Sequence, residues 1–305
     1  MTLFSKIASA AAVSMIALMA TPALAQEKIT EFRIGILGGE NSSDRLRSNE
    51  CIRAKTEELL GVPTKIFAPA DYNGVIEGLL GGNLDMAWLG ASAYAKVYLT
   101  NPEAVEPVLV KVNVDGTFGY HAIGFARADS GIKSLDDLKG KKFALGDPNS
   151  TSGFLIPSYE LNKAGYSTKN GEFFSEVVSS GGHEQSIVGV FNGDYPASVT
   201  WADGLGEWED GYNSGALRKA ADAGLVDMTQ LVQIWKSPII VEGPIVLRKA
   251  LPERVKVDVT GMLASLGFMD KECAYSFMAG EVLGLKPINH SAYENIVEVR
   301  RAAGN

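Results

Sequence analysis

The sequence predicts an α/β protein built as two lobes. Short apolar runs of strand length alternate with longer stretches of helical spacing, an order that is typical of α/β sheets. A helix-like stretch ending at Gly82 leads into a strand ending at Trp88, and another ending at Gly193 leads into a strand ending at Trp201. These two helix–strand units resemble each other, which indicates two lobes of the same construction. The alternative is that the units are similar by chance, because glycine commonly follows a helix. A chain of 305 residues is also long enough to form two lobes.

The first part of the chain predicts three strands and two helices. The strands are apolar runs bounded by glycine or proline, and each helix begins at a capping side chain and ends at glycine. In chain order we expect a strand at 32–37, a helix from Ser42 or Ser43 to Leu60, a strand at 64–67, a helix capped by Asp71 that ends at Gly81, and a strand at 84–88.

The absence of a linker segment predicts where the chain crosses between the lobes. The sequence contains no low-complexity linker, so we expect two short crossings, near residues 115–120 and 240–245. Residues 26–117 and 244–305 would form one lobe, and residues 118–243 would form the other.

The N-terminus has the pattern of a secretory signal, residues 1–25. Lys6 precedes an apolar stretch, and small residues at Ala23 and Ala25 form a cleavage site before Gln26. The apolar stretch is short and interrupted, which disfavours a membrane anchor, and no later stretch is apolar enough to span a membrane. We therefore predict export to the periplasm with cleavage after Ala25.

Composition and charge argue against several classes of function. The net charge is −8, and no basic cluster occurs, which disfavours nucleic acid and anionic lipid as partners. The sequence has no nucleophile elbow, Walker loop or dinucleotide-binding glycine pattern. His121, His183 and His290 lie in unrelated contexts and no Cys-x-x-Cys pair is present. We therefore predict no metal site, no cofactor and no catalysis.

Cys51 and Cys273 are the two cysteines of the sequence. In an exported protein such a pair is a candidate disulfide, because the compartment is oxidising. Two free buried thiols are the alternative, since sequence alone does not place the Cα atoms within bridging distance.

The segment from Gly146 to Leu155 is the strongest candidate for an anion site. A turn there runs into a helix-like stretch that starts at Ser150, Thr151 and Ser152. The first amides of a helix lack partners within it and favour negative charge, so neighbouring hydroxyls complete an anion-binding cradle. The alternative is that Asn149 or Ser150 simply caps the helix.

This segment, with Trp235 to Pro238, resembles the phosphonate-binding proteins of ABC import systems, the periplasmic phosphonate, phosphate and phosphite receptors. The likeness continues along the chain in the same order, which makes it specific. It includes Asp71-Tyr72, Asp85 to Trp88, Asp115-Gly116 followed by Gly119-Tyr120, His183-Glu184, Asp203, and Ser237 to Ile240.

The resemblance implies a type II periplasmic-binding fold, whose two lobes close over a ligand in the cleft. It also implies ligand contacts at matching positions: Ser150, Thr151, Ser152 and His183 on the phosphonate oxygens, Tyr72 and Tyr120 as walls of the cleft, and Asp203 on the amino group of an aminophosphonate. Each has an ordinary alternative role: a helix cap, a surface histidine, a core aromatic or a turn aspartate.

The sequence departs from the family pattern at one place. Relatives that bind aminoethylphosphonate often have an acid directly before the proline that matches Pro244, whereas this chain has Gly243 there and Glu242 one residue earlier. Glu242 either reaches the amine along a different path or points away. If it points away, phosphite, phosphate or a simple alkylphosphonate becomes the better ligand.

We therefore expect the solute-binding component of an ABC importer. It would capture a small phosphonate, with 2-aminoethylphosphonate preferred, by lobe closure and deliver it to a membrane permease. A ligand sensor for a signalling partner would use the same cleft. An enzyme on this fold is a third alternative, and His183 and Asp203 resemble an acid–base pair, but no nucleophile accompanies them.

Overall fold

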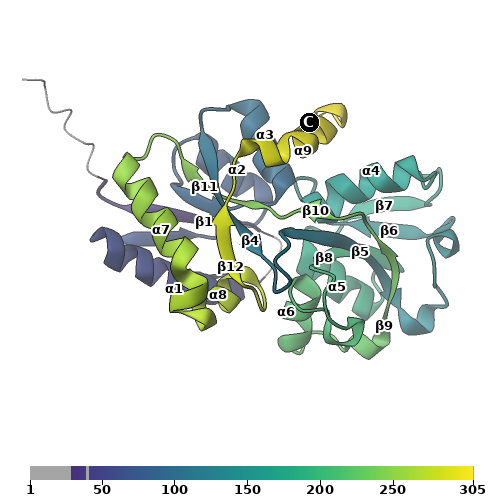
Figure 1. Ribbon diagram of the computed structural model, residues 1–305. Coiled ribbons are helices and arrows are strands. Elements are labelled where there is room, and N and C mark those ends of the chain that lie inside the picture. Colours follow the sequence, from purple (N-terminus) through teal and green to yellow (C-terminus); the bar gives the residue numbers. More distant parts are fainter. Residues whose placement is uncertain (1–28, 39–40, 305) are drawn as a thin grey trace, which may run out of the picture.

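The computed structural model describes residues 29–38 and 41–304. The predicted leader and its cleavage site lie outside the described residues. Two β-sheets lie side by side, each flanked by helices (Figure 1), which confirms the predicted α/β class. We call each sheet together with its helices a lobe.

The first lobe is built around a mixed sheet that uses strands from both ends of the described chain. Its strand order is β2 (Thr64–Phe67), β1 (Phe32–Ile36), β3 (Met86–Trp88), β11 (Pro244–Arg248), β4 (Val105–Val112) and β12 (Gly284–Pro287). β1 runs parallel to both β2 and β3, while β11 and β12 pair antiparallel with their neighbours. The three strands predicted for this part of the chain are present as β1, β2 and β3.

Helices cover both faces of the first sheet (Figure 1). They are α1 (Ser42–Leu60), α2 (Tyr72–Leu80), α3 (Ala91–Thr100), α7 (Glu253–Met269), α8 (Lys271–Met278), the short 3₁₀ helix η6 (His290–Tyr293) and α9 (Glu294–Ala302). The C-terminal helix α9 packs against α3.

Side-chain caps fix the starts of the first two helices. Asp71 caps α2 as predicted, because its carboxylate accepts a hydrogen bond of 3.1 Å from the Gly74 amide. The cap of α1 is Asn41, whose side chain accepts from the Ser43 amide at 2.9 Å. The predicted cap at Ser42 or Ser43 is therefore wrong. Asparagine satisfies the unpaired amides of a helix start about as well as serine does.

The second lobe contains the middle of the chain. Its strand order is β10 (Ile240–Val241), β5 (Gly119–Arg127), β8 (Ala197–Ala202), β6 (Lys142–Leu145) and β7 (Glu176–Ser179), with β9 (Leu231–Lys236) also paired to β5. Its helical segments are η1 (Ala128–Ser130), η2 (Asp136–Leu138), η3 (Thr151–Leu155), α4 (Ile156–Lys163), α5 (His183–Asn192), η4 (Trp208–Asp210), α6 (Ala216–Asp222) and η5 (Met228–Gln230).

The chain passes twice between the sheets. One passage, residues 113–118, leads from β4 to β5, and the other, residues 242–243, leads from β10 to β11. Both passages overlap the segments where the sequence predicts crossings. The lobe boundaries at 117/118 and 243/244 stay a prediction.

A disulfide joins Cys51 in α1 to Cys273 in α8, with their Cα atoms 5.8 Å apart. The two cysteines are therefore bridged, and the alternative of two free buried thiols is wrong. The bond ties the first helix of the first lobe to a helix 222 residues later in the chain.

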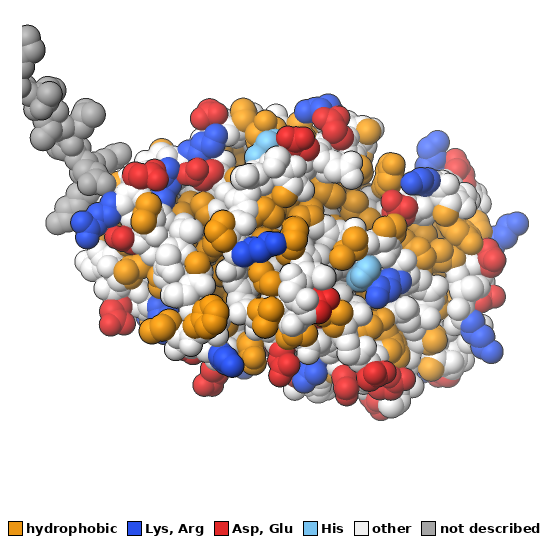
Figure 2. Space-filling view, viewed as in Figure 1, with side chains coloured by type: hydrophobic (Ala, Val, Ile, Leu, Met, Phe, Trp, Pro, Cys, Tyr) orange, Lys and Arg blue, Asp and Glu red, His pale blue; other side chains and the backbone are white. Residues whose placement is uncertain are grey.

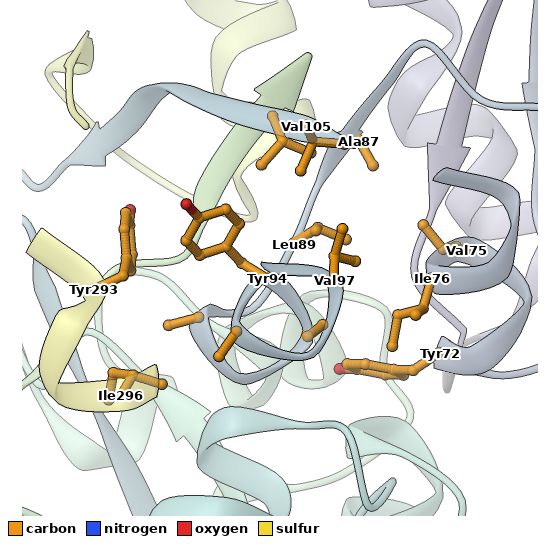
Figure 3. Packing of buried hydrophobic residues seen from close by; sticks show 14 of the residues in the cluster. Tyr72, Val75, Ile76, Ala87, Leu89, Tyr94, Val97, Val105, Tyr293 and Ile296 are labelled. Atoms are coloured by element: carbon orange, nitrogen blue, oxygen red, sulfur yellow. The ribbon is translucent and has the colours of Figure 1, made fainter. Parts of the chain in front are cut away.

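Apolar residues from both lobes pack into one buried cluster. It contains Tyr72 and Val75 from α2, Tyr94 from α3 and Tyr293 from η6, which Figure 3 shows around the short helix α3. Tyr120 of β5 in the second lobe belongs to the same cluster. The lobes are thus in direct apolar contact.

The surface gives no sign of a basic patch on the face drawn in Figure 2, where Lys and Arg side chains lie scattered among Asp and Glu. Among the helices of the described ranges, none combines the length and the apolar character that crossing a bilayer requires.

Candidate functional site

A cavity of about 140 Å³ lies where the two lobes meet. A cavity of about 150 Å³ holds a molecule the size of benzene, so this volume suits a small organic ligand. All the predicted ligand-binding residues except Asp203 line it: Tyr72, Tyr120, Ser150, Thr151, Ser152, His183 and Glu242.

The serine and threonine turn forms one wall of the cavity. Ser150 caps the following helix, because its Oγ accepts a hydrogen bond of 3.0 Å from the Gly153 amide. The first helical turn, η3, is a π-helix rather than the regular helix start that the sequence predicts, and α4 continues from it. Single π-turns are rare and occur often at functional sites. A Cβ atom on Gly153 would lie 2.8 Å from the Ser150 Oγ, so a larger residue there would displace the capping hydroxyl.

His183 begins α5 and is buried in the cavity wall, so the surface alternative is wrong. Its Nε2 lies 3.2 Å from the Ser150 Oγ, and its Nδ1 lies 3.2 Å from the Thr200 Oγ1. These two hydroxyls hold the ring in place between the turn and β8. No local pattern singles out Thr200, which lies inside the strand β8.

Thr151 connects the turn to the first lobe. Its Oγ1 accepts a hydrogen bond of 2.9 Å from the Ser92 amide, in the first turn of α3. The N-cap of α3 is Gly90, which offers no side chain to these amides, and a Cβ there would lie 2.9 Å from the Thr151 Oγ1. A hydroxyl that accepts from an amide still has its own hydrogen to donate. Thr151 therefore combines a lobe contact with a donor for an oxyanion.

Tyr72 and Tyr120 belong to the buried apolar cluster and also line the cavity, and their contact with a ligand stays a prediction. The Tyr72 amide donates to the Asp147 carboxylate at 3.3 Å, across the two lobes. Burial raises the pKa of the Tyr120 phenol, and the charge of Glu242 raises it further, while the hydroxyls of Ser152 and Thr151 lower it. The phenol is therefore neutral at ordinary pH and retains a hydrogen to donate.

Glu242 lines the cavity and has a cationic neighbour that the sequence analysis missed. The Nζ atom of Lys111 in β4 lies 3.5 Å from Glu242 Oε2, and both side chains are almost completely buried. Burial raises the pKa of Glu242, although the charge of Lys111 acts in the opposite direction. One signal pointed to Lys111: it is a lysine inside the apolar strand VEPVLVKV.

Asp203 belongs to the same polar network but does not line the cavity. Its Oδ2 accepts a hydrogen bond of 3.0 Å from the Ser214 hydroxyl, and its Oδ1 accepts from the Leu205 amide at 3.1 Å. The Ser214 Oγ in turn accepts from the Lys111 Nζ at 3.2 Å. Asp203 is therefore connected to Glu242 through Ser214 and Lys111.

Gly243 explains the departure from the family pattern. A Cβ atom at this position would lie 1.9 Å from the Leu89 carbonyl oxygen, so no side chain fits while the backbones keep this approach. The Gly243 carbonyl also accepts a hydrogen bond of 3.0 Å from the Trp88 indole. An acid directly before Pro244 is thus incompatible with this packing, and Glu242 is the acid at this crossing.

Asn149, beside the turn, makes several contacts with the first lobe. Its Oδ1 accepts from the Arg300 Nη2 at 2.8 Å and from the Lys96 Nζ at 3.2 Å, and its Nδ2 donates to Asn73 at 3.1 Å. Arg300 also donates to the Ser92 hydroxyl at 2.6 Å. The second lobe is therefore fastened to α2, α3 and α9 next to the cavity.

Comparison with known proteins identifies the family. A family model described as "ABC transporter, phosphonate, periplasmic substrate-binding protein" matches residues 34–293. The phosphonates-binding periplasmic protein of Escherichia coli K12 is 31% identical over 97% of this chain and 83% of its own length. The phosphate-import protein PhnD of Mycolicibacterium smegmatis is 27% identical over 89% of this chain and 85% of its own length.

Solved structures agree with the two-lobed fold. PhnD1 of Prochlorococcus marinus, in complex with methylphosphonate, matches with a TM-score of 0.76 and 20% identity over 90% of this chain and 98% of that one. A binding protein of an ABC phosphonate transporter from Pseudomonas aeruginosa matches with a TM-score of 0.76 and 23% identity over 90% of this chain and 89% of that one. With the family model and the E. coli relative, we conclude that the chain belongs to the periplasmic substrate-binding proteins of ABC phosphonate transporters.

Proposed function

We propose that this receptor captures a small phosphonate in the cavity between its lobes and passes it to its membrane permease. The observation that supports this most strongly is that several hydrogen-bond donors line the cavity together. Ser150, Thr151 and Ser152 line it together with His183 and the neutral phenol of Tyr120. Several donors in the wall of one cavity suit an oxyanion with several oxygens.

Closure of the lobes over the ligand is part of the proposal. The cavity takes its lining from both lobes, and Thr151, Asn149 and Asp147 all bond to the first lobe. A ligand held by both lobes would favour the closed arrangement over an open one by its difference in affinity for the two.

Two candidate ligands differ in whether they carry an amine at the end opposite the phosphorus group. The sequence predicts 2-aminoethylphosphonate, with Asp203 and Glu242 as partners of the amine, and this stays a prediction. The contact of Glu242 with Lys111 supports the second candidate, an amine-free ligand such as methylphosphonate, phosphite or phosphate. Two similar proteins, a phosphate-import protein and a receptor solved with methylphosphonate, agree with this second candidate.

A thermal-shift and calorimetry panel tests the proposed function. The panel contains 2-aminoethylphosphonate, ethylphosphonate, methylphosphonate, phosphite, phosphate and methanesulfonate. A ligand that binds only the folded protein stabilises it by about 2.7 kcal/mol at a hundred times its dissociation constant. We expect a raised melting temperature with at least one phosphorus oxyanion and none with methanesulfonate. A flat response across the panel would refute the proposal.

The alternative classes have separate readouts. Turnover of a phosphonate by the purified protein would indicate an enzyme. Ligand-dependent binding to a signalling protein, without binding to a permease, would indicate a sensor.

A further inference from the structure

Lys111 is a buried cation inside the first lobe. Its side chain is 1% exposed, and it lies in β4 between apolar neighbours. A lysine ammonium loses its hydration on burial, so it needs anionic or hydrogen-bonding partners in the folded protein. The contacts of its Nζ atom therefore indicate the role of this lysine.

Those contacts reach both acids that the sequence predicts for a ligand amine. The Lys111 Nζ lies 3.5 Å from Glu242 Oε2 and donates to the Ser214 Oγ at 3.2 Å. The Ser214 hydroxyl donates onward to Asp203 Oδ2 at 3.0 Å. The ammonium thus contacts the Glu242 carboxylate directly and is linked to the Asp203 carboxylate through the Ser214 hydroxyl.

An aromatic face completes the surroundings of the ammonium. The Nζ atom lies 4.9 Å from the centre of the Trp201 ring, and Trp201 lines the cavity. Acids and an aromatic face are the partners that proteins use to hold an alkylammonium group. Here the alkylammonium group belongs to the protein itself.

We infer that Lys111 takes the place of a ligand amine and makes the receptor select amine-free phosphorus oxyanions over aminophosphonates. The inference rests on the proposed function, because it concerns the tail end of the same cavity. Lys111 is a specificity residue that acts on the ligand through Glu242 and through its charge.

Of the two acids in this network, Glu242 is the one that a second cation in the cavity could reach. One lysine and two acids sum to a negative charge, but both Asp203 oxygens already accept hydrogen bonds, from Ser214 and Leu205, and Asp203 does not line the cavity. Glu242 Oε2 has no hydrogen-bond partner among the described residues and depends on the charge of Lys111. A ligand ammonium would have to share Glu242 with Lys111 and meet its like charge at short range.

Calorimetry with two ligands tests the inference. Ethylphosphonate and 2-aminoethylphosphonate share the head group and the two-carbon chain, so their affinity ratio isolates the amine. We expect the wild-type protein to bind ethylphosphonate more tightly. The Lys111→Met variant exposes Glu242 to the ligand amine, and we expect the ratio to shift toward 2-aminoethylphosphonate by about tenfold or more, equivalent to about 1.4 kcal/mol.

Two further variants control the experiment. Lys111→Met combined with Glu242→Gln leaves no unpaired acid, so it should fold, bind ethylphosphonate and show no gain for the amine. Lys236→Met removes an exposed lysine whose Nζ lies 5.7 Å from the Tyr212 ring, and it should keep the wild-type ratio. If Lys111→Met itself proves unstable, its melting temperature should be restored more by 2-aminoethylphosphonate than by ethylphosphonate.

The outcomes separate the two proposals. If the wild-type protein binds no phosphorus oxyanion, the proposed function fails. If it binds them but prefers the aminophosphonate, or if the ratio is the same in Lys111→Met, the inference about Lys111 is wrong and the proposed function stands.

Discussion

Asn149 accepts a hydrogen bond from Arg300 across a sequence separation of 151 residues and across the two lobes, at 2.8 Å. Asn149 lies directly before the turn that lines the cavity, and Arg300 belongs to the last helix of the first lobe. Arg300 is 1% exposed, so its hydrogen bonds are shielded from bulk solvent. Hydrogen bonds to charged groups contribute about 1.5–3 kcal/mol each.

The first prediction concerns this contact. Asn149→Ala removes the acceptor of Arg300 and Lys96 from the second lobe and should weaken ligand binding by about tenfold, because the closed arrangement loses part of its stabilisation. Calorimetry with the tightest ligand of the panel measures the effect. Ser92→Ala is the matched control: it removes an Arg300 partner within the first lobe, so it should lower stability with less effect on affinity. Equal losses of affinity in both variants would contradict a role in closure.

The second prediction concerns the hydroxyls of the turn. Thr151→Ala combined with Ser152→Ala should reduce affinity for the phosphonate by about a hundredfold or more, because each hydroxyl bonded to a charged group contributes about 1.5–3 kcal/mol. The control is Ser265→Ala in α7, whose hydroxyl donates to the Met262 carbonyl on an exposed face. An affinity close to wild type in the double variant would assign head-group recognition to backbone amides instead.

The third prediction concerns the disulfide. Replacing both Cys51 and Cys273 by serine should lower the free energy of unfolding by about 2–5 kcal/mol, because the bond closes a very long loop in the unfolded chain. Urea denaturation of the variant and of the wild-type protein, each with and without reductant, measures the difference. Reductant should shift the wild-type midpoint toward that of the variant and leave the variant unchanged. An unchanged midpoint in the variant would show that the bond adds no stability.

The fourth prediction concerns pH and Glu242. Burial raises the pKa of this carboxyl in the folded protein above the ordinary glutamate value, so the folded state binds its proton more tightly than the unfolded state. The contribution of Glu242 to stability should therefore fall as the pH rises from below the ordinary value through the raised one. Comparison with Glu242→Gln isolates this contribution, because the amide does not titrate. In urea denaturation the wild-type protein should lose stability relative to Glu242→Gln over this range; a gain would refute the assignment.

Local patterns predicted the parts of the fold that depend on neighbouring residues. The apolar runs at 32–37 and 64–67 and the cap at Asp71 appear as expected, since strand burial and capping are set within a few residues. The cap at Asn41 was missed because several adjacent polar residues can cap a helix. The π-turn after Ser150 was missed as well, because no sequence rule distinguishes it from a regular helix start.

The composition of the site was harder to predict where partners come from distant segments. The hydroxyls of the turn were predicted from the helix start, and His183 was predicted from the family resemblance; all of them line one cavity. The contact of Lys111 with Glu242 joins two segments far apart in the chain, and no local pattern reports such a pairing. Asp203 was predicted from the family resemblance, but its carboxylate accepts hydrogen bonds from Ser214 and Leu205 and does not line the cavity.

The close approach of Gly243 to the Leu89 carbonyl also restricts how this receptor can change during evolution. A new side chain at residue 243 would first have to separate two backbones at a crossing between the lobes. Substitutions at Lys111 or Glu242 leave that backbone contact intact and alter only the charge at the end of the cavity. Divergence toward new ligands within this lineage should therefore proceed through exchanges at positions 111 and 242, while position 243 stays glycine.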